Sequence, residues 1–438
     1  MADLLIYVRT VHFSSAMLVA GVVFFTVAVF NPAARIAGQK THAATEVRAW
    51  NRLLAWSALL LAVISGAGWL FLTAAAMSGD ALVDVLPNGT LWTVLTETTF
   101  GHATLIRLGL AMALTALFVP VFSTRSHAAF SLDLTAAIVA AAFVAGLAWA
   151  GHAAGGLGSE AIIHPAADVL HLIAAAAWVG ALAPLAILLA VTGHEPDELG
   201  MARTATQRFS LLGMAAVATL LATGLVNSLY LVGSVDALLH THYGKLLLLK
   251  LALFLGMVAI AAFNWSQLTP ALVQNNNVAN AQAARRRLCR NAAIETIAGA
   301  LIIAIVAVLG TQPPANHAGH HSTSGVVPPD AAFQHIHTDQ GMADVMIEPG
   351  RVGAARATIR LWNDDLETLP AKSVTLTLTA PAVGSEPVTQ TAMQQPDAAW
   401  IVDGVQLPES GNWTIEVDAD LANGKQLKLR APIEIGAK

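Results

Sequence analysis

The sequence is poor in charge and nearly lacks cysteine. Only 12% of the 438 residues are charged and 55% are hydrophobic, whereas soluble proteins are roughly 25% charged. This composition excludes an ordinary soluble domain and indicates an integral membrane protein. With Cys289 as the one cysteine, the chain has no internal disulfide framework. The net charge of −5 gives no indication of a nucleic-acid partner.

Several catalytic signatures are absent as well. The sequence contains no Walker-type glycine-rich loop, which argues against ATP-driven pumping. It has no CxxC pair, no HExxH and no GxSxG. We also find no internal repeat in the sequence. Nothing in the residues themselves therefore specifies an enzyme.

Long apolar segments, in contrast, are abundant. A membrane-crossing helix needs about 20 mostly apolar residues, and the segments of sufficient length are residues 4–30, 53–76, 103–122, 132–150, 166–192, 209–232, 245–266 and 292–311. We therefore predict an all-α polytopic membrane bundle of about eight transmembrane helices over residues 1–311.

Arginine residues gather in alternate loops between these segments. They occur at 35–52, 125, 203–208 and 285–290, whereas Lys245 is the one basic residue near the intervening loops. Because positive residues stay on the cytoplasmic side, we predict a multi-pass inner-membrane protein with both termini in the periplasm. Cys289 would then lie beside arginines in the reducing compartment.

The composition changes after Gly310. Residues 312–332 form a His/Pro-rich linker, which is expected to lack a fixed structure. Residues 333–438 contain short alternating runs such as "SVTLTLTAP" and "NWTIEVDAD", separated by Gly and Pro turns. Period-two alternation predicts strands, so we expect a periplasmic, immunoglobulin-like all-β sandwich.

The 15 histidines are distributed unequally across this topology. His42, His127 and His194 fall on the arginine side, and all the others fall on the periplasmic side or in the outer ends of helices. Imidazole is the commonest protein metal ligand. This asymmetry predicts that the protein meets a metal on its outer side.

Two helices carry histidines within the predicted membrane region. His164, Asp168 and His171 follow one another at spacings that place them on one helical face, and His12 lies at a similar depth in the first helix. An ionisable residue at that depth is expected to face protein or a cavity. We predict that His12 and His171 form the intramembrane part of a metal site, with His164 as a further ligand and Asp168 as an orienting partner. The alternative is that they are packing histidines bonded to neighbouring hydroxyls or carbonyls.

Further candidate ligands lie in the outer loops and in the β-domain. His240 and His242 form an "HTH" that can chelate if the backbone is extended, while His152 and the "HAGHH" of residues 317–321 have a similar, weaker signal. The β-domain opens with "HIHTDQGMADVMI". Imidazole and thioether ligands together suit copper, so we predict a copper site formed by His335, His337, Met342 and Met346. The alternative is a surface HxH with both methionines in the sandwich core.

Four stretches resemble the copper resistance D (CopD) family of membrane proteins. They are "VRTVHFSSAMLVAGVVFF" at 8–25, "HPAADVLHLIAAAAWVGALAPL" at 164–185, "YGKLLLLKLALF" at 243–254 and "NAAIETIAGALIIAIVAVLGTQPP" at 291–314. The resemblance implies an inner-membrane protein that takes part in copper uptake or homeostasis. Members of the family receive copper from a separate or fused copper-binding domain, so we expect the C-terminal domain, or a periplasmic copper chaperone, to act as the donor.

We therefore expect copper to pass from the β-domain to His171 and His12. Below His171 the sequence offers only weak ligand candidates, namely Met17, Met214, Met257 and Asn227. Lys250 and Arg107 fit a cation path poorly and are expected to pair with acids such as Asp168, to snorkel or to bind an anion. Two alternatives remain open: a haem b redox protein with paired axial histidines, and a factor that delivers copper to an oxidase without transporting it.

Overall fold

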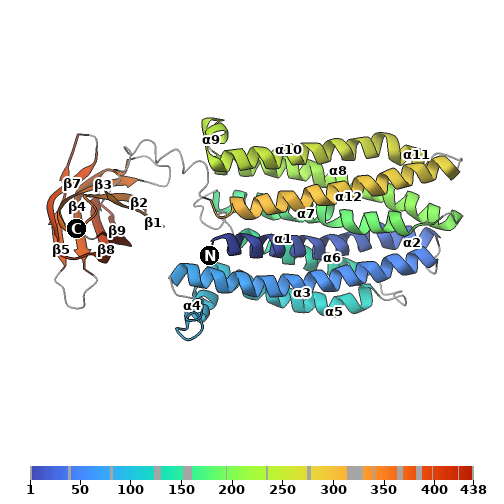
Figure 1. Ribbon diagram of the computed structural model, residues 1–438, viewed down its shortest axis with the longest axis horizontal. Coiled ribbons are helices and arrows are strands. Elements are labelled where there is room, and N and C mark those ends of the chain that lie inside the picture. Colours follow the sequence, from blue (N-terminus) through green and yellow to red (C-terminus); the bar gives the residue numbers. More distant parts are fainter. Residues whose placement is uncertain are drawn as a thin grey trace. The chain divides into compact units, whose positions relative to one another are not determined.

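The chain forms two compact units in the computed structural model, Met1–Gly319 and His320–Lys438 (Figure 1). The structure describes residues 2–37, 41–78, 82–122, 130–150, 160–193, 195–232, 235–273, 278–312, 328, 330–338, 341–362, 368–380, 387–396, 398–422 and 424–436. His152 and the histidines of 317–321 therefore lie outside the described residues, as does most of the predicted linker.

The first unit is a bundle of long helices (Figure 1). Its elements are α1 (Ala2–Phe24), the π-helical η1 (Phe25–Phe30), α2 (Asn31–Ala37), α3 (His42–Ser78), α4 (Thr90–Glu97), α5 (Thr99–Val121), α6 (Phe130–Ala145), η2 (Ala148–Ala150), α7 (Glu160–Val191), α8 (Pro196–Val232), α9 (Val235–His240), α10 (His242–Phe263), the π-helical η4 (Asn264–Leu268), α11 (Thr269–Val273) and α12 (Val278–Leu309).

The helical fold class predicted from hydropathy is confirmed. Within the described residues, seven helices are long and apolar enough to cross a membrane, and α6 is a shorter apolar helix. The predicted starts at 53 and 209 are too late, because the helices begin at His42 and Pro196. Hydropathy detects only the lipid-facing part of a helix, whereas the hydrogen-bonded backbone continues into the polar region beyond it.

The two ends of the bundle differ in charge. The N-terminus lies at the same end as α4 and α9, and α2 and α11 lie at the other (Figure 1). We call the second the arginine-rich end, because the arginines of α2, of the start of α3 and α8, and of the start of α12 are located there. The first is called the amino-terminal end.

Helices α1 and α7 cross with their backbones in contact. A Cβ built on Gly21 would lie 2.1 Å from the carbonyl carbon of Gly180, and one built on Gly180 would lie 2.2 Å from the carbonyl oxygen of Met17. Small residues allow such close approach between membrane helices. One apolar core lies around α1, α3, α5 and α6, and another lies around α7, α8 and α12, so this crossing joins the two halves of the bundle.

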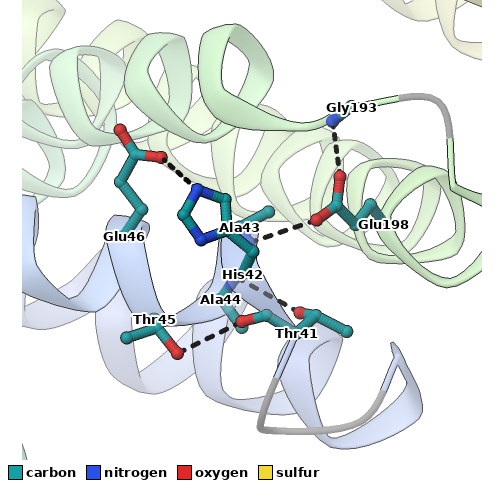
Figure 2. Close-up of polar contacts among 8 residues, drawn as sticks. All are labelled: Thr41, His42, Ala43, Ala44, Thr45, Glu46, Gly193 and Glu198. Atoms are coloured by element: carbon teal, nitrogen blue, oxygen red, sulfur yellow. Dashed lines mark hydrogen bonds and ion pairs between the residues drawn. The ribbon is translucent and has the colours of Figure 1, made fainter.

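A buried carboxylate links the halves again at the arginine-rich end (Figure 2). Glu198 of α8 accepts hydrogen bonds from the backbone N–H of Ala43, 3.2 Å away at the start of α3, and of Gly193, 2.7 Å away after α7. The N–H of Ala43 lies in the first turn of a helix and has no intrahelical acceptor, and the N–H of Gly193 lies in a loop. Glu198 therefore fixes the α7–α8 connection against the first turn of α3.

The second unit consists of two antiparallel sheets. The strand order is β1-β2-β3-β7-β6 in one and β5-β4-β8-β9 in the other. The strands are β1 (Ala332–Thr338), β2 (Gly341–Glu348), β3 (Gly353–Trp362), β4 (Ala371–Thr379), β5 (Val388–Thr391), β6 (Met393–Gln394), β7 (Trp400–Leu407), β8 (Gly411–Leu421) and β9 (Gln426–Ile435). Residues from both sheets share one apolar core, which confirms the predicted sandwich of two sheets.

We predict that Gly180→Ala destabilises the bundle. Its added methyl group would overlap the α1 backbone, which has no flexible side chain to move aside, and such overpacking costs about 1–3 kcal/mol. Thermal unfolding of the purified protein in detergent measures the effect. Gly109→Ala in α5 is the control, because a Cβ there meets nothing within 4 Å. Equal stability of the two variants would contradict the prediction.

Candidate metal site in the helical bundle and on the sandwich

His171 is held by one nitrogen and keeps the other available. Its Nδ1 lies 2.9 Å from the hydroxyl of Thr223 on α8. That hydroxyl donates its proton to the carbonyl of Thr219, 2.7 Å away, so it accepts from the imidazole. The proton of a neutral His171 is therefore on Nδ1, and Nε2 carries a lone pair that has no hydrogen-bond partner among the described residues. This is the form in which histidine binds a metal.

Charged and polar groups from three helices lie around this imidazole. Asp168, one turn before His171, accepts a hydrogen bond of 3.1 Å from the Asn227 amide on α8. Lys250 on α10 interacts electrostatically with both Asp168 and His171, and His164 interacts with Asp168. His164 and Lys250 thus lie within electrostatic range of Asp168. We refer to these residues as the His171 cluster.

His12 is bound at both ring nitrogens. Nδ1 lies 3.0 Å from the carbonyl of Ala62 and 3.1 Å from the hydroxyl of Ser65, both on α3. Nε2 lies 2.7 Å from Nη1 of Arg107 on α5. Since arginine is always a donor, Nε2 is the acceptor and its lone pair is occupied. The side chain, 3% exposed, matches the packing alternative as it stands.

The surroundings of the two histidines nevertheless correspond. His12 precedes Gly21 on α1 by the same number of residues as His171 precedes Gly180 on α7, and the two glycines contact each other.

The second helix of each half supplies a hydroxyl followed by a glycine. Nδ1 bonds to Ser65 in one half and to Thr223 in the other. A Cβ on Gly66 would lie 3.0 Å from Cε1 of His12, and one on Gly224 would lie 3.7 Å from Cε1 of His171. The missing side chain leaves room for the ring in both places.

The third helix of each half supplies a cation. A threonine side chain caps α5 and α10 in the same way, Thr98 by accepting from Gly101 and Thr241 by accepting from Gly244. Arg107 and Lys250 follow their caps by the same number of residues, and a short helix, α4 or α9, precedes each. The bundle thus contains one three-helix arrangement twice, α1–α3–α5 and α7–α8–α10, although the sequence shows no repeat.

One exchange explains why the two copies differ. Asp168 occupies the position in α7 that Arg9 occupies in α1. In the second copy the acid interacts with Lys250, whereas in the first copy Arg9 donates to the carbonyl of Gly310, 2.7 Å away, and Arg107 bonds to His12. The cation therefore blocks the imidazole only where no acid accompanies it.

The two histidines do not share a hydrogen-bond partner among the described residues. His12 bonds to α3 and α5, and His171 bonds to α8. A haem between them would need both Nε2 atoms to face one space, which the bond from Arg107 to His12 does not fit.

The "HTH" motif lies at a helix boundary. His240 is the last residue of α9 and His242 the first of α10, both exposed, and Thr241 between them caps α10. The two histidines thus flank one residue with extended backbone angles, Thr241 with φ −78° and ψ 155°, and metal chelation by them stays a prediction.

On the sandwich, β1 and β2 bring the predicted residues together. His335 pairs with Asp344 and His337 with Met342 in the strand ladder. Nδ1 of His335 lies 2.6 Å from the carboxylate of Asp344, which also accepts from the Trp362 indole at 3.0 Å. An imidazole fixed in this way by a carboxylate keeps Nε2 for a metal. The side chain of His337 lies outside the part of the chain that the structure describes.

The two methionines lie outside the sandwich core. Met342, Asp344 and Met346 alternate along β2 with the core residues Ala343, Val345 and Ile347, so they are on the opposite face of the sheet. Although Met342 is only 2% exposed, neither methionine belongs to the core between the sheets. This excludes the alternative in which they fill that core.

Sequence reasoning missed the partners that fix each imidazole. Two of these partners, Ser65 and Thr223, are distant in the sequence from the histidines they contact. The third, Asp344, lies on a different strand from His335, so only the fold makes these residues neighbours. In the parts of the chain that the structure describes, no group of three or more His, Cys, Asp or Glu side chains is placed to hold a metal. The two clusters are therefore partial ligand sets.

Comparisons with known proteins agree with the resemblance. The family model described as "Copper resistance protein D-like, N-terminal domain" matches residues 1–162. The model described as "Copper resistance protein D" matches residues 203–309. Inner membrane protein YebZ of Escherichia coli (strain K12) is 31% identical over 311 residues, which cover 70% of this chain and 98% of YebZ. The chain belongs to the copper resistance D family.

Two other relatives of this family are longer than the matched region. Copper transport protein CutJ of Bacillus subtilis (strain 168) is 25% identical over 252 residues, 57% of this chain and 42% of CutJ. Copper resistance protein D of Pseudomonas syringae pv. tomato is 34% identical over 152 residues, 34% of this chain and 49% of that protein. The chain thus spans less than half the length of either relative. No solved structure matches it.

We predict that His12 and His171 differ in their effect on stability. His12→Ala removes one of the two acceptors of the buried Arg107, which keeps the carbonyl of Phe143, and a hydrogen bond to a charged group contributes about 1.5–3 kcal/mol. His171→Ala removes one bond to a hydroxyl and costs about 1 kcal/mol, the usual net value of a hydrogen bond. Thermal unfolding in detergent compares them, and a larger loss for His171→Ala would contradict the assignment.

We also predict that Asp344→Asn weakens copper binding on the sandwich. The loss of a carboxylate that orients a histidine ligand typically costs about 10- to 100-fold in metal affinity. The measurement is a competition titration of the purified full chain with Cu(II), in a His171→Ala background. Asp403→Asn, which removes an exposed carboxylate paired with Arg356, is the matched control. An unchanged affinity in Asp344→Asn would exclude the site.

Proposed function

We propose that this protein binds copper at the amino-terminal end of its bundle and moves it inward across the bacterial inner membrane. The observation that carries the proposal is the geometry of His171. The bond to Thr223 fixes its tautomer, and the Nε2 lone pair remains available within the outer half of a membrane bundle. Membership of a copper resistance family supports copper as the metal, and imidazole suits copper.

The direction of movement follows from charge. Since positive residues remain in the cytoplasm, the arginine-rich end faces the cytoplasm, and both termini, the His171 cluster and the sandwich face the periplasm. Inward movement of a cation gains about 2.3 kcal/mol per charge for each 100 mV of membrane potential.

The sandwich is the donor in this proposal. His335, His337, Met342 and Met346 collect copper in the periplasm, alone or from a copper chaperone, and His164 and Asp168 lie next to His171 at the mouth of the bundle. His240 and His242, exposed at the same end, are additional capture ligands. His12 supports the fold of the first half through Arg107.

His171→Ala should abolish copper accumulation in cells that express the protein. Total cellular copper is measured by elemental analysis against wild type and an empty vector, at equal protein levels in the membrane. We expect His171→Ala to match the empty vector, because the substitution removes the imidazole whose Nδ1 is fixed by Thr223 and whose Nε2 has no hydrogen-bond partner among the described residues.

His42→Ala is the control for this experiment. His42 lies at the arginine-rich end, is almost fully exposed and contacts Glu46 (Figure 2). Cells that express the His42→Ala variant should therefore accumulate copper like wild type. Accumulation in His171→Ala equal to that of wild type would refute transport through this cluster and favour delivery of copper to another protein.

A further inference from the structure

A second polar site lies beyond the His171 cluster, toward the arginine-rich end. A cavity of about 360 Å³ is bounded by α7, α8, α10 and α12, and its lining is apolar except for a few oxygen-bearing side chains. These are Thr206, Ser210, Asn264, Thr269 and Glu295. The cavity is therefore mostly apolar and has a small number of polar groups, which is the composition typical of ligand sites.

Glu295 is the one titratable group among the described residues that line this cavity. It is 2% exposed and accepts a hydrogen bond from the amide of Asn264, 2.9 Å away. The oxygen of Asn264 in turn accepts from Asn291 at 2.7 Å. Asn264 opens the π-helical η4, and π-helical turns are frequent at functional sites.

The carboxylate lacks a counter-charge from the protein. No ion pair of Glu295 occurs among the described residues. Two arginines of the same helices donate hydrogen bonds to backbone carbonyls instead. Arg285 of α12 donates to the carbonyl of Leu189 on α7, and Arg208 of α8 donates to the carbonyl of Ala28. A buried, unpaired carboxylate is strongly disfavoured in a membrane, so a proton or a bound cation must balance it.

A second oxygen in the cavity is unsatisfied. The hydroxyl oxygen of Thr269 is buried and has no hydrogen-bond partner among the described residues. Buried polar groups are nearly always satisfied, so this hydroxyl is free to bind whatever enters the cavity. Thr269 also lines an adjoining cavity that reaches Arg208, which links the site to the arginine-rich end.

An aromatic pair separates this site from the His171 cluster. Trp178 follows His171 at a spacing that places both on one face of α7, and it lines the cavity. Its ring meets that of Phe254 edge to face, with centroids 5.9 Å apart, and Phe254 lies one turn after Lys250 on α10. The same helices thus present a polar outer region, an aromatic barrier and a polar inner cavity.

We propose that Glu295 is a cation-exchange site for the inner half of the membrane, which carries a proton at rest and releases it when a cation arrives. The carboxylic acid loses its proton to water at the arginine-rich end, and the carboxylate then balances the arriving cation. When the cation leaves to that water, a proton from the same water returns to the carboxylate, so charge is conserved, no net proton is moved and nothing is oxidised or reduced. The identity of that cation as copper rests on the proposed function, whereas the resting proton does not.

Carbodiimide labelling tests the resting proton without any transport. The reagent dicyclohexylcarbodiimide modifies protonated carboxyl groups in apolar surroundings, and mass spectrometry of the full chain in detergent locates the adduct. We expect an adduct on Glu295 and none on Glu198, which is also buried but whose carboxylate accepts two backbone N–H groups (Figure 2). Absence of an adduct on Glu295 would overturn the proposal, regardless of whether the protein transports copper.

Transport in vesicles tests the exchange. The full chain is reconstituted in vesicles with a copper-sensitive dye inside, and Cu(I) is added outside. Glu295→Gln should reduce copper entry by at least about tenfold, because a neutral amide cannot balance a cation in an apolar site. It should leave Cu(I) binding at the His171 cluster unchanged, and His42→Ala, which changes an exposed residue at the arginine-rich end, should behave like wild type.

The outcomes separate the two proposals. Copper entry into Glu295→Gln vesicles within about twofold of wild type would refute the exchange site while leaving transport intact. Wild-type vesicles that admit no copper would refute the proposed function, and the carbodiimide adduct alone would then decide whether Glu295 carries a proton.

Discussion

The constraint on which this bundle depends is that the polar side chains within it must find their partners in other parts of the same chain or in a bound ligand. A lipid bilayer offers no water to satisfy them, and an uncompensated charge is costly there. Arg107 uses His12, Arg9 uses a carbonyl at the end of α12, and Asn227 uses Asp168. The positions of the ionisable side chains therefore determine which helix faces meet, as much as the apolar surfaces do.

The two copies of the three-helix arrangement show how little change alters a site. Both fix an imidazole through Nδ1 to a hydroxyl and place a cation on the third helix. The acid or base one turn before the histidine decides whether that cation binds the imidazole or leaves it available. A histidine bound at both nitrogens and one with an unoccupied Nε2 among the described residues thus share one scaffold, and the difference between them is set by Arg9 and Asp168.

Much of the architecture could be predicted from composition and periodicity. Apolar length gave the spans and alternation gave the sandwich, because both patterns are local. The common face of His164, Asp168 and His171 was also predictable, since helical spacing fixes it. What could not be predicted was the second partner of each group. Neither the bond of Arg107 to His12 nor that of Asp344 to His335 has a sequence signature, because each depends on how separate elements pack. The correspondence of the two halves was hidden for a similar reason: it lies in a few contact residues, while the lipid-facing positions between them need only be apolar.

The contacts between the halves also bear on whether the protein can be divided. Arg9 in the first half needs the carbonyl of Gly310 at the end of the last helix, and Ala43 at the start of α3 needs the carboxylate of Glu198 from the second. The second half thus supplies an acceptor to a donor of the first at each end of the bundle. Separate expression of α1–α6 and α7–α12 would leave donors in one half and acceptors in the other without partners, so this membrane unit is a single obligate assembly despite its repeated internal plan.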